Sequence, residues 1–119
     1  MDNKEFSRQL EIRTKKFAIS VIRLSASLPG SPEGRVIRNQ FTKSGTSIGA
    51  NYREANRSRS KADFSNKIKI CESESSETAY WLEIIGELGW TENDKTEELI
   101  IEADELLAIF TSIGKSLKG

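Results

Sequence analysis

The feature that most constrains the fold of this chain is an apolar spacing of alternating three and four residues, which recurs in four stretches. Side chains at that spacing fall on one face of an α-helix, whereas a strand requires alternation with period two. The four seams are Leu10, Thr14, Phe17, Val21, Leu24 and Leu28; Ile37, Phe41, Ser44, Ile48, Asn51 and Ala55; Phe64, Ile68, Cys71, Ser75, Thr78, Leu82 and Ile85; and Leu99, Ala103, Leu106, Phe110, Ile113 and Leu117. The sequence therefore predicts four amphipathic helices.

Turn and capping residues separate these stretches. Ser31 before Pro32 is typical of a helix N-terminus, Ser60 with Asp63 three residues later forms a capping box, and Gly89 is typical of a helix end. Similar helix lengths and short loops favour an all-α, antiparallel up-down-up-down four-helix bundle. We predict helices at 5–28, 32–57, 61–89 and 93–117 within a single domain covering 1–119.

The length of 119 residues suffices for one hydrophobic core without disulfides or metals. No apolar run approaches the roughly 18 residues that a membrane-spanning helix needs. The first residues lack the basic and then apolar layout of a signal peptide. Cys71 is the only cysteine, which excludes an internal disulfide and favours a reducing compartment. We therefore expect a cytoplasmic protein.

The charges are divided unevenly along the chain although the net charge is zero. Residues 1–70 contain 15 Lys/Arg and 6 Asp/Glu, a balance of +9, whereas residues 71–119 contain 3 Lys/Arg and 12 Asp/Glu, a balance of −9. This asymmetry suits a polyanion-binding surface, and it equally suits two halves that pair with each other within a bundle or between subunits.

Three of the predicted helices carry more apolar residues than one buried face requires. The additional positions are Ile12, Ile19 and Ile22; Ile70, Trp81, Ile84 and Leu88; and Ile100 and Leu107. They indicate either a wider core or a contact between subunits. Because large aromatic residues anchor contacts between proteins, we predict an oligomer interface that includes Ile70, Trp81 and Ile84.

Residues that could carry chemistry are few. Histidine is absent, which removes the usual general base and the usual metal ligand of helical bundles, so we expect no metal and no cofactor. Cys71 falls on a core seam and is expected to be buried. Two carboxylates, Glu74 and Glu77, lie one helical turn apart. We predict a structural polar network of Asn51, Glu54, Glu74 and Glu77; an acid–base pair is the alternative.

Two further features lie between positions 45 and 69. Gly45 and Gly49, one turn apart, predict a close approach of two helix backbones. The basic run of Arg53, Arg57, Arg59 and Lys61, followed by Lys67 and Lys69, is the best candidate for a nucleic-acid contact, with ordinary solvated charges as the alternative.

The sequence resembles a known family at three motifs. These are Ser47-Ile48-Gly49-Ala50-Asn51-Tyr52-Arg53-Glu54-Ala55, Arg59-Ser60-Lys61 with Asp63-Phe64 and Lys67-Ile68, and Glu77-Thr78-Ala79-Tyr80-Trp81-Leu82. They look like the hallmark stretches of the four helix bundle protein family, also called the 23S ribosomal RNA intervening-sequence protein family.

The resemblance implies a bacterial bundle that assembles as a ring, commonly a pentamer, without catalytic residues. It also implies similarity to the accessory variability determinant of diversity-generating retroelements, a basic protein that works with nucleic acid. Our leading hypothesis is a non-enzymatic, oligomeric binding or scaffold module with RNA or DNA as a candidate ligand. The alternatives are a structural or protein-partner module that does not bind nucleic acid, and a carboxylate-based enzyme.

Overall fold

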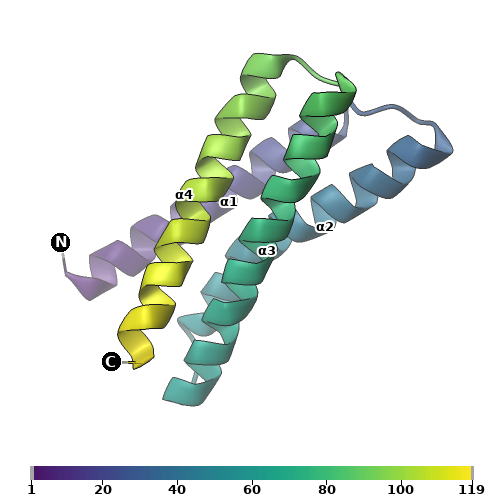
Figure 1. Cartoon of the computed structure of the whole chain (residues 1–119). Helices are drawn as coiled ribbons and strands as arrows, with labels where there is room; N and C mark the ends of the chain where they lie inside the picture. Colours follow the sequence, from purple (N-terminus) through teal and green to yellow (C-terminus); the bar gives the residue numbers. More distant parts are fainter. Residues whose placement is uncertain (1, 119) are drawn as a thin grey trace.

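The computed structural model describes residues 2–118, which fold into four helices in chain order. They are α1 (Asn3–Ser25), α2 (Pro32–Ala55), α3 (Lys61–Leu88) and α4 (Asn93–Lys118). The helices run alternately up and down, and Figure 1 shows α3 and α4 lying across α1 and α2. The predicted all-α four-helix bundle is confirmed, and the first and last positions of the predicted domain 1–119 lie outside the described residues.

The helices begin where the sequence places capping residues. The Ser31 hydroxyl accepts a hydrogen bond from the Gly34 amide at 3.1 Å, and the Ser60 hydroxyl accepts one from the Asp63 amide at 3.1 Å. Gly89 ends α3 in the left-handed conformation, with φ of 69°. These contacts satisfy amide and carbonyl groups that have no partner within the helix, and the three predicted caps are confirmed.

The first helix ends three residues before the predicted position 28. The amides of Ser27 and Leu28 donate to the carbonyls of Leu24 and Ser25, so the last turn tightens from the α-helical to the shorter spacing. Pro29 disfavours helical geometry at the residue before it, which explains the early end.

The predicted seams form the core, with one correction. Most of their residues are buried, including Phe17, Phe41, Leu82 and Phe110. In α2, however, the buried position after Ile48 is Tyr52, 2% exposed, and the predicted seam residue Asn51 lies at the edge. At about 100° per residue, Tyr52 lies closer than Asn51 to the direction of the buried Ile48, and the predicted seam resumes at the buried Ala55. The Tyr52 ring packs edge-on against Phe110, with ring centroids 5.5 Å apart.

Gly45 and Gly49 of α2 lie where α1 approaches closely. A Cβ atom added at Gly45 would lie 2.7 Å from both methyl carbons of Val21, and one at Gly49 would lie 3.0 Å from the Thr14 hydroxyl. A larger side chain at Gly45 would force its neighbour to shift, and one at Gly49 would require Thr14 to give way by a few tenths of an ångström. The predicted close approach is confirmed.

Hydroxyl groups occupy several core positions and all find partners. Thr78 donates to the Glu74 carbonyl at 2.7 Å and contacts the Ser44 hydroxyl across the α2–α3 interface at 3.1 Å. Ser75 donates to the Cys71 carbonyl at 2.8 Å. Among residues 2–118, no buried side-chain nitrogen or oxygen lacks a hydrogen-bond partner. The polar residues of the seams therefore do not destabilise the core as unpaired buried groups would.

Neighbours along the chain make the main packing interfaces of the bundle. α1 packs on α2, α2 on α3 and α3 on α4, whereas α1 and α4 share the smallest contact. α1 and α3 lie diagonally across the bundle from each other and run in the same direction. Their outward faces are therefore on different sides of the molecule.

Candidate functional site

The additional apolar residues predicted on α1 lie on its outward face. Ile12 is 50% exposed, Ile19 is 40% exposed and Ile22 is 49% exposed. They point away from the core seam of the same helix, because they lie about half a turn from its buried residues. The outer isoleucines of α1 are thus an apolar strip without a partner in the bundle.

A second outward strip lies on α3. Ile70 is 40% exposed and Leu88 is 50% exposed, while Trp81 and Ile84 are half-buried. Trp81 also packs against the core and stands edge-on to Tyr80, with ring centroids 5.1 Å apart. Its indole N–H donates to the Glu77 carboxylate at 3.2 Å. The outer face of α3 therefore carries carboxylates among its apolar side chains.

Three other apolar residues, Phe6, Val36 and Ile101, are exposed outside the two strips. Each is a single position outside a repeating row, and isolated exposed apolar residues are normal on protein surfaces. On α4, the expected additional residues Ile100 and Leu107 are half-buried, and Ile100 packs against the core. Rows with several exposed apolar residues therefore lie on α1 and α3, although Trp81 of the α3 row also packs against the core.

Three of the four residues of the predicted polar network make separate contacts. Asn51 donates to the Ser47 carbonyl within its own helix at 2.8 Å. Glu54 accepts from the Lys67 ammonium at 3.0 Å. The Glu77 carboxylate accepts a hydrogen bond from the Trp81 indole. Within the described residues, no hydrogen bond or ion pair joins two of the four predicted network residues.

The Glu74 and Glu77 carboxyls differ in their surroundings. Partial burial raises the pKa of Glu74, and the neighbouring Glu77 raises it further, while Lys43 of α2 acts in the opposite direction. An open hollow between α3 and α4 is lined by Glu77 and Tyr80 but not by Glu74. The two carboxyls therefore do not face a common cleft.

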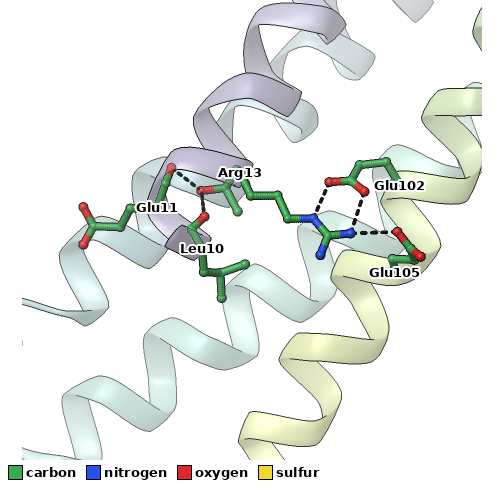
Figure 2. Close-up of polar contacts among 6 residues, drawn as sticks. Leu10, Glu11, Arg13, Glu102 and Glu105 are labelled. Atoms are coloured by element: carbon green, nitrogen blue, oxygen red, sulfur yellow. Dashed lines mark hydrogen bonds and ion pairs between the residues drawn. The ribbon is translucent and has the colours of Figure 1, made fainter. Parts of the chain in front are cut away.

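An ion-pair cluster that the sequence analysis missed joins α1 to α4. The Arg13 guanidinium donates two hydrogen bonds of 2.7 Å to Glu102 and one of 2.7 Å to Glu105, as Figure 2 shows. Glu102 raises the pKa of Arg13 chiefly through these hydrogen bonds. The opposite charges of the two halves of the sequence were the available signal, but they did not indicate which arginine would form the bridge.

The basic run lies at the end of the bundle where α2 ends and α3 begins. Arg57, Arg59 and Lys61 are exposed, and Arg53 lies 3.7 Å from the Glu11 carboxylate. The C-terminal turn of α4, with Lys115 and Lys118, is at the same end because the helices alternate in direction. The fold thus adds two lysines to the basic run, and we call these residues together the basic end.

The sulfur of Cys71 is enclosed between α2 and α3. Its thiol lies 3.5 Å from the Ile48 carbonyl, and burial raises its pKa to about 12. A thiol with so high a pKa is a poor nucleophile, and the predicted burial of this residue is confirmed. Between positions 2 and 118 no group of three or more Cys, Asp or Glu side chains is arranged to hold a metal ion.

No helix among the described residues is long and apolar enough to cross a membrane.

None of the curated proteins matches the chain. A crystal structure of a protein of unknown function from the S23 ribosomal protein family of Bacteroides thetaiotaomicron is similar, with 34% sequence identity and a TM-score of 0.81. The match covers 88% of this chain and 97% of that one. The family described as 23S rRNA-intervening sequence protein matches residues 4–112, and the chain belongs to that family.

Proposed function

We propose that the chain is a non-enzymatic, self-assembling bundle that acts as a scaffold or binding module. The observation that carries this proposal is the presence of two unpartnered apolar strips, one on α1 and one on α3. Burial of apolar surface contributes about 25 cal/mol per Å² to association, so rows of large exposed side chains favour contact with another protein surface.

The distribution of charge supports assembly as well. Among the ion pairs within residues 2–118, those that join the basic half of the sequence to the acidic half all involve Arg13. Most of the opposed charge is therefore not paired inside one bundle, and it remains for contacts between molecules. In this proposal the assembly forms in the cytoplasm, where the single thiol of Cys71 stays reduced.

Size-exclusion chromatography with light scattering tests the proposal. We expect a mass that is a multiple of the 13.3 kDa chain, and a shift toward smaller species in high salt if charge contributes to the contact. A monomer at every concentration and salt level would refute self-assembly.

The basic end favours nucleic-acid binding as a second candidate function. Arg57, Arg59 and Lys61 are exposed and form no ion pair within the described residues, and Lys115 and Lys118 lie at the same end. Guanidinium and ammonium groups bind phosphate oxygens and release counterions, so the affinity would fall steeply with salt.

A gel-shift titration at low salt, with RNA and with DNA, tests this second function. We expect the triple substitution of Arg57, Arg59 and Lys61 by alanine to abolish the shift, and the same change at Arg35 and Arg38 in α2 to leave it intact. If the unchanged protein shifts neither RNA nor DNA, nucleic-acid binding is refuted, and the remaining hypothesis is a structural or protein-partner module.

A further inference from the structure

The outward strips of α1 and α3 each follow a complete second heptad pattern. The α1 row consists of Arg8, Ile12, Lys15, Ile19, Ile22 and Ala26, and the α3 row consists of Ile70, Glu74, Glu77, Trp81, Ile84 and Leu88. Both rows advance by the same steps of four, three, four, three and four residues. Rows with this spacing are the surfaces through which helices pack side by side.

The two rows have opposite charges. Lys15 in the α1 row, and Lys16 and Arg23 beside it, are exposed and form no ion pair within the residues that the structure describes. Glu74 and Glu77 in the α3 row likewise form no ion pair there, although burial and mutual repulsion raise the pKa of Glu74. A cation placed beside these carboxyls would relieve the repulsion.

We infer that the α1 row of one copy packs along the α3 row of a second copy, with the two helices running in the same direction. This inference rests on the proposed self-assembly and adds which faces meet and in which register. The parallel register places Lys15 opposite Glu77, Ile19 opposite Trp81 and Ile22 opposite Ile84. It also places Ile12 opposite Glu74.

The antiparallel register is chemically worse. It places Ile19 opposite Glu77 and Ile22 opposite Glu74, so each carboxylate would be desolvated against an apolar side chain without a partner. It also leaves Lys15 against the Trp81 ring and away from the carboxylates. The parallel register therefore leaves one carboxylate, that of Glu74, opposite an isoleucine, whereas the antiparallel register leaves two, and only the parallel register pairs Lys15 with Glu77.

A contact between two different faces determines the type of assembly. Each copy offers one α1 row and one α3 row, so a pair of copies leaves one of each free, and further copies add until a ring closes or a filament grows. Within one bundle α1 and α3 run in the same direction. Copies related by rotation about an axis along the bundle therefore bring these helices together in parallel.

Charge exchange tests the register. Lys15→Glu and Glu77→Lys should each weaken assembly about tenfold or more, because each places like charges opposite each other. The double variant, and an equal mixture of the two single variants, should assemble again. If the double variant is as weak as either single variant, the parallel register is wrong.

Blocking one face at a time tests the pairing itself. Ile19→Glu removes the α1 row and Ile84→Lys removes the α3 row, while Ile101→Glu on α4 is a matched control because Ile101 is exposed and lies outside both rows. We expect each row variant to be monomeric in light scattering, the control to assemble, and far-UV circular dichroism to show folded helices in all three.

An equal mixture of Ile19→Glu and Ile84→Lys should form a complex of two chains and nothing larger, because one intact face of each kind remains. A defined oligomer of either variant alone would mean that like faces pair, and would overturn the inference while self-assembly stands. Two monomeric variants that do not combine would also overturn it. A monomeric unchanged protein would refute the proposed function itself.

Discussion

The close approach of α1 and α2 at Gly45 yields a prediction whose sign depends on geometry. In an exposed helix, Gly→Ala stabilises a protein by about 1 kcal/mol, because alanine has the better helix propensity. At Gly45 the new Cβ would lie 2.7 Å from both methyl carbons of Val21, a side chain that is itself fully buried. Normal carbon–carbon contacts are about 3.5–4.0 Å, so one helix must move by about 1 Å.

Overpacking of this kind costs about 1–3 kcal/mol. After subtraction of the propensity gain, Gly45→Ala should lower the free energy of unfolding by about 1 kcal/mol, and by up to about 2 kcal/mol if the helices cannot separate. Gly114 in α4 is the matched control, since a Cβ there meets no atom within 4 Å. Gly114→Ala should raise the free energy of unfolding by up to about 1 kcal/mol.

Urea denaturation followed by far-UV circular dichroism, at one protein concentration, measures both changes. The variant that combines Gly45→Ala with Val21→Ala should be more stable than the sum of the single effects predicts, because Val21→Ala removes the methyl carbons that clash. If Gly45→Ala stabilises the protein as much as Gly114→Ala does, α1 and α2 do not approach closely at this position.

Three further predictions concern single side chains. Because the folded-state pKa of Glu74 is raised, its ionisation costs stability as pH rises through that pKa, and the cost is absent below the ordinary carboxyl range. Glu74→Gln should therefore be at least as stable as the unchanged protein at neutral pH and should lose that advantage in acid. Thermal melts over a range of pH measure this, and equal pH dependence of the two proteins would contradict it. Arg13→Ala should lower the free energy of unfolding by about 1 kcal/mol in low salt and by less in high salt; salt-independent destabilisation would mean that packing outweighs the charge pair with Glu102. Cys71 should react with a disulfide reagent only after denaturation, and rapid reaction of the native protein would show that its thiol is accessible.

The periodicity of the sequence predicts the helices and most of their buried faces, because each helix needs one apolar side toward the core. It misses the exchange of Asn51 for Tyr52, since a strict heptad does not follow the slow rotation of a real helix. The caps at Ser31, Ser60 and Gly89 are predictable because their chemistry is local.

The contacts between distant segments could not be predicted from the sequence. Arg13 and Glu102 are 89 positions apart in the chain, and many other cations and carboxylates could have formed that pair. The sequence likewise predicts additional apolar residues on α1 and α3 without indicating whether they widen the core. The structure answers this for α1, where Ile12, Ile19 and Ile22 are 40–50% exposed, whereas on α3 Trp81 packs against the core.

The packing of each helix against its neighbour along the chain has a consequence for how the protein folds. Contacts between segments close in sequence need little loop closure, and chains dominated by such contacts fold fast. The α1–α2 hairpin can form while the ribosome is still synthesising α3, and each later helix adds to a surface that is already present. We expect the small α1–α4 contact, with its Arg13 cluster, to form last, because it joins the two ends of the chain. We therefore expect amide hydrogens along that interface to exchange with solvent sooner than those between α2 and α3.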